Sequence, residues 1–309
     1  MNIAGMGLVF PGGAGVSALR DAMSTGQPSI RTCVEKEGVE VLAVPAAALM
    51  GNPVLAPARR ADRFCKMSLL AATEAWQGCA AVPERVGIVF ATALGPHATV
   101  FRFVNEILDY GEAKTSPTVF SQSVHAAAAS MIASAIGIHG PTLNVADLAL
   151  PFEEALRLAD GWLASDRCDA VLVGAAEELS DVLAHVVRRM WSTSVVLGEG
   201  AVFFRLERTG GVRVCVEETV SSDAACCLTD ALSLGKQPEE SQREDLPQGA
   251  LCLSYAALWG STRIGVAFHL AAAVLMRREK DLRKECGLLS DGRIQVVSRC
   301  GTRRRVITV

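Results

Sequence analysis

The sequence contains few aromatic residues, no long hydrophobic run and no excess of positive charge. Aromatic side chains make up 5% of its 309 residues, although half of the residues are hydrophobic. No uninterrupted apolar stretch reaches about 18 residues, so we expect no membrane span. The formal net charge is −3, and nothing in it points to nucleic acid or to an anionic membrane surface. The chain is long enough to bury a large core, as one compact domain.

The ten cysteines follow no regular spacing and include no CxxC pair. No two candidate ligands lie at a metal-like spacing, so we expect neither a metal nor a cofactor. Met1 leads directly into a strand-like run without the pattern of a signal peptide. We therefore expect reduced thiols and a cytoplasmic protein. Cys226 and Cys227 could supply a nucleophile, but we favour structural cysteines.

Strand and helix signals alternate over the first two thirds of the chain, which predicts an α/β architecture. Residues 86–91 and 169–175 are apolar runs typical of buried strands, and 125–136 is apolar on every side, as in a buried helix. A helix begins near Pro151, where Pro suits the first turn. Further strands are expected at 2–9, 142–147, 199–207, 211–218, 251–257, 293–298 and 305–309, and further helices at 16–24, 62–78, 98–109 and 266–277.

Beyond residue 218 these signals weaken. Residues 235–249 are charged and contain proline, which predicts an exposed loop. We therefore divide the chain into an N-terminal α/β half over 1–218, a variable linker or loop over 219–250, and a shortened C-terminal half over 251–309.

Seven short segments combine glycine turns, buried strands and helix starts. They are IAGMGLVFPGG at the start, RRADRF at 59–64, ERVGIVFATALG at 84–95, SPTVFSQSVHAAAAS at 116–130, GPTLNV at 140–145, CDAVLVGAAEE at 168–178 and LGEGAVFFRLE at 197–207. In this order they resemble the β-ketoacyl-(acyl carrier protein) synthases of the thiolase superfamily. The resemblance implies a thiolase-like layered α/β/α/β/α fold, with a complete N-terminal half and a shortened C-terminal half.

The resemblance also locates the position of the family's nucleophile. In ketosynthases the nucleophilic Cys lies nine residues after the Gly of a Gly-Pro turn and 28 residues before the Glu of a Gly-Gly-Ala-Glu motif. Counted forward from Gly140 and back from Glu177, both spacings end at Ala149. A methyl group cannot attack a thioester. The resemblance therefore implies a member that lacks the catalytic Cys.

The other catalytic groups of the family are two histidines and a lysine. The family's Lys-x-x-x-Gly-His segment best matches residues 261–266, so that Ser261 replaces the lysine and Val266 the histidine. His269 could take the role in a shifted register, although we favour a core histidine. The His-Gly-Thr-Gly-Thr string does not occur, and the closing Gly-Phe-Gly-Gly turn survives only as Gly301.

Other residues could border the position matched to the family's catalytic site. Asp147 could act as a surrogate acid or base, but a carboxylate that caps the following helix is the favoured interpretation. His125 lies in the segment that, in ketosynthases, lines the acyl pocket and crosses the dimer interface. It could polarise a thioester together with Ser123, or serve the interface, which we favour. Pocket depth could be set by Phe120, Met131 or Phe152.

Three functions stay open. The favoured one is a non-catalytic, chain-length-factor-like partner of an active ketosynthase in fatty acid or polyketide (aryl-polyene-like) synthesis, not active alone. It implies a heterodimer and an acyl carrier protein, with a homodimer as the other arrangement. The second is a divergent acyl-thioester transferase or hydrolase, 3-oxoacyl-carrier-protein synthase-like, that uses Asp147, His125 and Ser123. The third is a scaffold with no thioester role.

Overall fold

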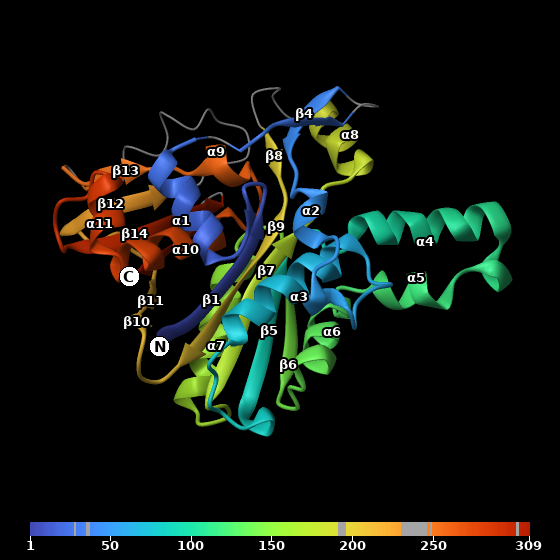
Figure 1. The fold of residues 1–309 in the computed structure, drawn as a ribbon, viewed down its shortest axis with the longest axis horizontal. Helices are drawn as coiled ribbons and strands as arrows, with labels where there is room; N and C mark the ends of the chain where they lie inside the picture. Colours follow the sequence, from blue (N-terminus) through green and yellow to red (C-terminus); the bar gives the residue numbers. More distant parts are fainter. Residues whose placement is uncertain (28, 35–37, 191–195, 230–245, 248, 301–302) are drawn as a thin grey trace.

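The computed structural model describes residues 1–27, 29–34, 38–190, 196–229, 246–247, 249–300 and 303–309. A mixed sheet of seven strands forms the centre of the molecule (Figure 1). Along it the strands run in the order β10-β1-β9-β7-β5-β6, and β2 pairs with β1. Its members are β1 (Asn2–Phe10), β2 (Gly13–Ala14), β5 (Val86–Thr92), β6 (Thr142–Ala146), β7 (Ala170–Glu177), β9 (Gly200–Glu207) and β10 (Val212–Arg213).

A second sheet of five strands has the order β11-β15-β14-β12-β13, and a small third sheet has the order β3-β4-β8. The second sheet consists of β11 (Cys215–Glu217), β12 (Ala224–Thr229), β13 (Leu251–Leu253), β14 (Arg293–Cys300) and β15 (Arg303–Thr308). The third consists of β3 (Thr32–Val34), β4 (Val39–Leu42) and β8 (Leu197–Gly198).

The two larger sheets share one plan. The strands β1, β5, β6, β7 and β9 of the first sheet correspond in chain order to β11 through β15 of the second. Within each sheet, the five strands lie side by side in the same order: the first in the chain, then the fifth, the fourth, the second and the third. The parallel and antiparallel pairings are also the same in both sheets. One connection is much shorter in the second half. Residues 218–223 join β11 to β12, whereas residues 11–85 form the corresponding connection from β1 to β5.

Helices separate and cover these sheets. The helices α3 (Arg63–Trp76) and α6 (Ala127–Ile136) pack on one face of the first sheet (Figure 1). The helices α7 (Pro151–Ala164) and α10 (Gly265–Arg278) contact both sheets and form the layer between them. Residues 265–276 of α10 are all buried, as the apolar sequence on every side of this helix predicts. The remaining helices are α1 (Val16–Thr25), α2 (Ala46–Leu49), α4 (His97–Tyr110), α5 (Pro117–Gln122), α8 (Asp181–Met190), α9 (Ala256–Trp259), α11 (Lys280–Glu285) and the 3₁₀ turns at Pro53–Leu55, Pro83–Arg85 and Glu112–Lys114.

The predicted α/β layering is confirmed, but two of the predictions beyond residue 218 are wrong. Residues 224–229 were assigned to a linker and instead form β12, between β13 and β14. This run of small Ala and Cys side chains lacks the β-branched signal of a strand. The strand expected at 251–257 ends at Leu253, and α9 begins at Ala256. The loop predicted at 235–249 lies mostly outside the described residues.

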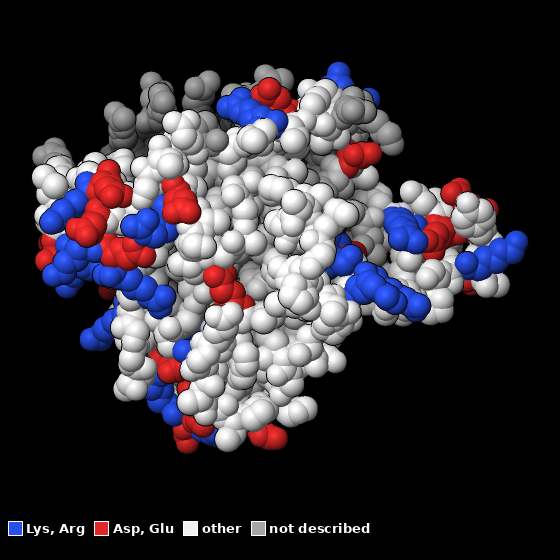
Figure 2. Space-filling model, in the orientation of Figure 1, with Lys and Arg blue, Asp and Glu red and all other residues white. Residues whose placement is uncertain are grey.

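The helices α4 and α5 project from the body of the molecule (Figure 1), and we call residues 97–122 the arm. Only Thr99 is buried in the 14 residues of α4. Its hydroxyl donates to Asp62 Oδ2 at 2.8 Å and ties the base of the arm to α3. Both charge signs and uncharged surface lie along the arm in Figure 2. No helix of the described residues is long and apolar enough to cross a membrane.

Candidate functional site

Three parallel strands end side by side at one edge of the first sheet. The strand β5 pairs with β6 and with β7, so the residues that follow these strands meet there. They are 92–95, 147–150 and 177–178. In α/β sheets, ligands bind beyond the carboxyl ends of parallel strands, so this edge is the candidate site.

Ala149 lies in the turn between β6 and α7 and is half-buried. Its backbone amide donates to Asp147 Oδ1 at 3.0 Å, and the amide of Asp147 donates to the Thr92 carbonyl at 3.3 Å. The carboxylate of Asp147 thus closes a turn ahead of α7. It does not cap the helix, because the N-cap residue Leu150 has no side-chain cap and the bond goes to an earlier amide. The side chain of Ala149 is a methyl group, which has no nucleophilic atom.

Glu177, at the end of β7, is buried beside this turn. Its Oε1 accepts from the Thr92 hydroxyl at 2.9 Å and from the amides of Ala93 and Leu94. Burial raises the pKa of Glu177 to about 7, and the positive charge of Arg263 acts against that rise. Since Arg263 belongs to the segment before α10, that segment lies near the end of β7.

A second buried carboxylate lies next to the first. Glu178 Oε1 accepts from the amide of Ala98 at 2.9 Å. Burial raises the pKa of Glu178 to about 8, and the carboxylates of Asp62, Glu199 and Glu177 add to the rise. The imidazole Nδ1 of His97 lies 4.0 Å from Glu178 Oε1, and burial lowers the pKa of His97.

Glu199 and Arg63 form a third buried feature. The carboxylate of Glu199 is 1% exposed and pairs with the guanidinium of Arg63. It also accepts from the amides of Val44 at 2.9 Å and Leu179 at 3.1 Å. These bonds join α3, the segment before α2 and the segment before α8. The pair therefore fixes the backbone around the site.

The segment matched to the family's lysine and histidine is buried, with structural contacts. The amide of Ser261 donates to the Val196 carbonyl at 2.8 Å, and its carbonyl accepts from Gly198 at 3.1 Å. Val266 is a core residue in the first turn of α10. Neither side chain offers the charge or the titrating nitrogen that the matched family positions carry.

His269 is fully buried in α10. Its Nδ1 lies 3.0 Å from the Gly265 carbonyl, and its Nε2 accepts from the amide of Tyr255 at 3.3 Å. The ring meets Trp259 edge-on at 4.9 Å, and burial lowers the pKa of His269 to about 4. Both nitrogens are occupied within the fold, so this neutral imidazole fits the core role.

The structure does not assemble Ser123, His125 and Asp147 into a catalytic set. The Ser123 hydroxyl donates to the Phe120 carbonyl at 2.8 Å, at the end of its own helix. The ring of His125 is exposed and lies over Gly95, where an added Cβ would come within 2.7 Å of His125 Cδ2. Among the described residues, no hydrogen bond joins His125 to Ser123 or to Asp147.

The three candidates for pocket depth lie in different places. Phe152 is fully buried in the core between the sheets, with its ring centroid 5.8 Å from that of Phe204. Met131 is half-buried in α6, on the other face of the first sheet. Phe120 is exposed on the arm and contacts Phe103, with the ring centroids 5.4 Å apart. Phe152 therefore packs in the core, and its role in pocket depth stays a prediction.

Cys226 and Cys227 do not offer a reactive thiol. All ten cysteines are free. Cys226 and Cys227 are buried in β12, and burial raises their pKa values to about 12 and about 11. A thiolate is the nucleophilic form, so these two thiols are unreactive near neutral pH.

Sequence reasoning missed the polar groups that support the site. Thr92 accepts from the Gly95 amide at 2.9 Å and donates to Glu177, so one hydroxyl organises the end of β5. The pairing of Arg63 with Glu199 joins residues 136 apart in the chain. The Arg-Ala-Asp-Arg-Phe segment and the Gly-Glu-Gly segment were noted as motifs, but their pairing carries no local signal.

A comparison with known protein families identifies the family of this chain. The model for "Beta-ketoacyl synthase, N-terminal domain" matches residues 44–255. The chain belongs to the β-ketoacyl synthase family. That match covers more than half of the chain and runs past the boundary expected at 218. A search of curated proteins gave no match.

Solved ketosynthases share the whole fold of this family member. The ishigamide ketosynthase/chain length factor superposes with a TM-score of 0.80 at 18% identity, over 99% of this chain and 98% of that one. A β-ketoacyl synthase from Burkholderia phymatum gives 0.77 at 15% identity, over 99% and 98%. A ketosynthase with its chain length factor from Xenorhabdus doucetiae gives 0.59 at 13% identity, over 100% and 98%. The fold is therefore the thiolase-like ketosynthase fold.

Proposed function

We propose that this chain is a non-catalytic ketosynthase homologue that pairs with an active ketosynthase as a chain-length-factor-like subunit. The pathway would be polyketide (aryl-polyene-like) or fatty acid synthesis. The observation that carries the proposal is Ala149 in the turn ahead of α7. Acyl transfer through a covalent intermediate requires a nucleophile, and a methyl group supplies none.

The neighbourhood of Ala149 supports the same reading. The Ala149 amide is held by Asp147, and Glu177 is held by three donors. His269 is held inside α10 and is kept neutral by burial. These hydrogen bonds lie within the fold and stabilise a loop conformation, which fits a structural role. In this proposal the backbone of the family's site is retained, and these side chains stabilise the fold.

The surface on the same side supports a partner subunit. The strand β6 lies at the edge of the first sheet, and a strand edge offers unpaired backbone groups. Leu143 on β6, Leu148 in the following turn and Leu108, Tyr110 and Phe120 on the arm are exposed apolar side chains. Large exposed apolar areas mark protein interaction sites. A ketosynthase that covers this surface would form the heterodimer, and a second copy would form a homodimer.

Several proteins with a similar fold work with partners of this class. The ishigamide and Xenorhabdus structures are each described as a ketosynthase with its chain length factor. A third, AntDE:AntF, is described as a type II acyl carrier protein in complex with its ketosynthase. These descriptions concern those proteins. They make a ketosynthase and an acyl carrier protein the partners to test first.

Intact mass spectrometry tests the loss of catalysis. The purified chain is incubated with acyl and malonyl thioesters carried on acyl carrier protein, and its mass is measured before and after hydroxylamine. We expect no adduct. An acyl-sized increase that hydroxylamine reverses would favour the divergent transferase instead, and peptide mapping would locate the acylated side chain.

Co-purification tests the partner. The chain is co-expressed with an intact ketosynthase, and the molar mass of the purified complex is measured by light scattering. A one-to-one complex supports the proposal. Two separate species, with the chain alone and unreactive, would favour a scaffold with no thioester role.

A further inference from the structure

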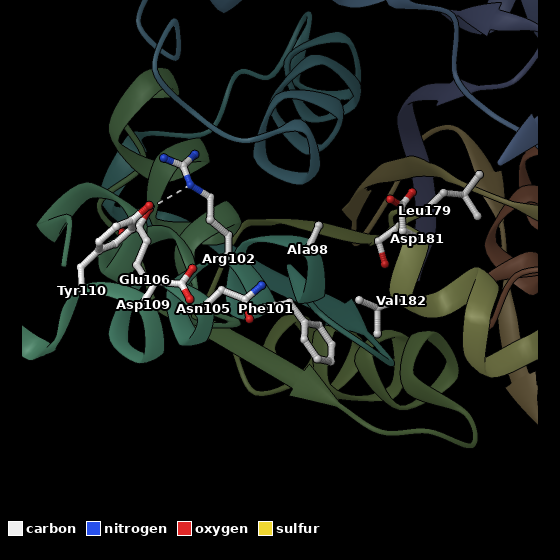
Figure 3. A pocket seen from close by; sticks show the side chains of 11 residues that line it. Ala98, Phe101, Arg102, Asn105, Glu106, Asp109, Tyr110, Leu179, Asp181 and Val182 are labelled. Atoms are coloured by element: carbon white, nitrogen blue, oxygen red, sulfur yellow. Dashed lines mark hydrogen bonds and ion pairs between the residues drawn. The ribbon is translucent and has the colours of Figure 1, made fainter. Parts of the chain in front are cut away.

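The second sheet carries a pair of cysteines that face each other on neighbouring strands. Three of the ten cysteines lie on the adjacent strands β12 and β13. These strands lie at the opposite end of the molecule from the arm (Figure 1), whose groove beside the start of α8 is shown in Figure 3. In the parallel pairing of the two strands, Cys227 lies opposite Cys252, and Cys226 lies opposite Leu251.

The two faces of β12 separate its adjacent cysteines. Cys226 and Leu228 belong to the core between the sheets, and Leu251 of β13 packs against the same core. Side chains alternate between the two faces of a strand. Cys227 and Cys252 therefore point together to the face away from α7 and α10, which we call the outer face of the second sheet.

The strand on the other side of β12 agrees with this placement. Gln295 of β14 is in register with Cys227, and its Nε2 donates to the hydroxyl of Thr308 on β15 at 2.9 Å. Cys227 and Gln295 are both fully buried. A row of side chains thus crosses the outer face and ends on the edge strand β13 at Cys252, whose thiol is exposed.

The backbone spacing suits a disulfide between Cys227 and Cys252. Paired strands lie about 4.7–4.9 Å apart, and the Cα atoms that a disulfide joins are about 4.4–6.8 Å apart. The Cys252 thiol makes a weak contact with the Ala250 carbonyl, with Sγ and O 3.7 Å apart. Rotation about the Cα–Cβ bond of Cys252 exchanges this contact for Cys227. The strand β13 is three residues long and lies at the sheet edge, so it can adjust to the closure.

The two thiols differ in their access to reagents. Cys252 is exposed and can meet a reagent in solvent, whereas Cys227 is buried. Burial raises the pKa of Cys227 to about 11, and the neighbouring Cys252 adds to that rise. Cys227 therefore acts only on a group already attached beside it. Intramolecular attack by a well-oriented group has an effective concentration on the order of 10⁵ M, which offsets the small thiolate fraction.

We propose that Cys252 and Cys227 form a thiol-modification site that reacts with a low-molecular-weight disulfide such as glutathione disulfide. The Cys252 thiolate attacks one sulfur of the small disulfide, forms a mixed disulfide and releases one small thiolate. The Cys227 thiolate then attacks Cys252 Sγ and releases the second small thiolate. Two protein thiols are oxidised to one disulfide, the small disulfide is reduced to two thiols, and the two protons pass through solvent to those thiols.

The product joins the edge strand β13 covalently to β12. It closes the chain over residues 227–252, which restricts the unfolded chain, so the oxidised protein should unfold at a higher urea concentration than the reduced protein. The inference concerns the second sheet and does not depend on the proposed function. Its test needs neither a ketosynthase nor an acyl carrier protein.

Peptide mapping of the full chain tests the site. The reduced chain is incubated with glutathione disulfide at pH 8, quenched with acid and digested with trypsin without reduction. Cys227 and Cys252 lie on different tryptic peptides, 214–236 and 244–263, which the product should hold together. Cys33 is also exposed, but it lies in register with Glu40. Cys252 should lose its glutathione at least about tenfold faster than Cys33, because a neighbouring thiol replaces a bimolecular step.

Two variants locate the bond within the peptide 214–236, which also contains Cys215 and Cys226. Cys226→Ala removes the adjacent thiol on the inner face and should form the link as fast as the native chain. Cys227→Ala should stop at the mixed disulfide on Cys252. In the native chain, which needs no variant to fold, fragmentation of the linked peptides should place the bond at Cys227. A lasting mixed disulfide on Cys252, no reaction there, or a link to Cys215 or Cys226 would overturn the proposal.

Discussion

The carboxylate of Asp147 holds the backbone amide of Ala149 through a 3.0 Å hydrogen bond between Oδ1 and N. This contact places a negative charge two residues before Ala149, the position matched to the family's cysteine. A carboxylate beside a thiol raises the pKa of that thiol and so reduces the fraction of thiolate. Restoring the cysteine alone is therefore a weak route to reactivity.

The first prediction concerns that position. In the Ala149→Cys variant we expect slow alkylation of the new thiol by iodoacetamide at pH 7.5. Adding Asp147→Asn, which keeps the turn but removes the charge, should increase the rate about three- to tenfold, the effect of half to one pKa unit. Peptide-level mass spectrometry reads the site separately from the exposed Cys33 and Cys252. Equal rates in both variants would show that Asp147 does not control the site.

The second prediction concerns the pH dependence of stability. Burial raises the pKa of Glu177 from 4.5 to about 7, so between these values the folded chain binds more protons than the unfolded chain. The free energy of unfolding should therefore fall as pH rises from about 5 to about 8. The Glu177→Gln variant should remove up to about 3 kcal/mol of that fall.

Urea unfolding at pH 5.5 and pH 8 measures this difference. The buried carboxyls of Glu178 and Glu153 have raised pKa values too and act in the same direction, so part of the slope should remain. The Glu112→Gln variant changes an exposed carboxyl on the arm and serves as the control. The same slope in Glu177→Gln and in the native chain would contradict the prediction.

The third prediction separates a packing role from an interface role. Phe152→Ala removes a fully buried ring from the core between the sheets and should lower the free energy of unfolding by about 3–5 kcal/mol. Phe120→Ala truncates an exposed ring on the arm and should change it by less than about 1 kcal/mol. Denaturant unfolding of both variants measures these changes. Similar losses of unfolding free energy in the two variants would contradict the prediction that Phe152 is a packing residue and Phe120 an interface residue.

The fourth prediction concerns the arm in the proposed complex. Leu108 is 76% exposed on α4, and Leu108→Glu should weaken pairing with a ketosynthase at least about tenfold, while the melting temperature of the isolated chain stays the same. Leu289 is 84% exposed in the segment between α11 and β14 and supplies a matched control in Leu289→Glu. Both variants are compared by light scattering after co-expression. Equal pairing by Leu108→Glu and the native chain would remove the arm from the interface.

Local patterns predicted those parts of the fold in which neighbours along the chain decide the structure. The helix at 266–277 was predicted from its apolar sequence, and α10 has those boundaries within one residue. The turn at Ala149 could be found by counting, because β6, the turn and α7 are contiguous. Each of these features depends on spacing that the sequence displays directly.

Long-range pairings could not be predicted in this way. The strand β12 pairs with the parallel strands at Leu251–Leu253 and Arg293–Cys300. Its own small residues give no local signal of a strand. Glu199 pairs with Arg63, which is 136 residues away in the chain, and the ring of Phe152 packs against that of Phe204 in the core. A family motif shows that such residues matter, but only the folded chain shows which of them meet.

The position of β15 has a consequence for the order in which the molecule can form. All strands of the first sheet that carry the shared plan are complete by Glu207, so this half can close early during synthesis. The second sheet cannot, because β15 at residues 303–308 inserts between β11 and β14. Until then the inner faces of α7 and α10 lack their outer cover. A nascent chain would thus expose that layer until β15 has been synthesised.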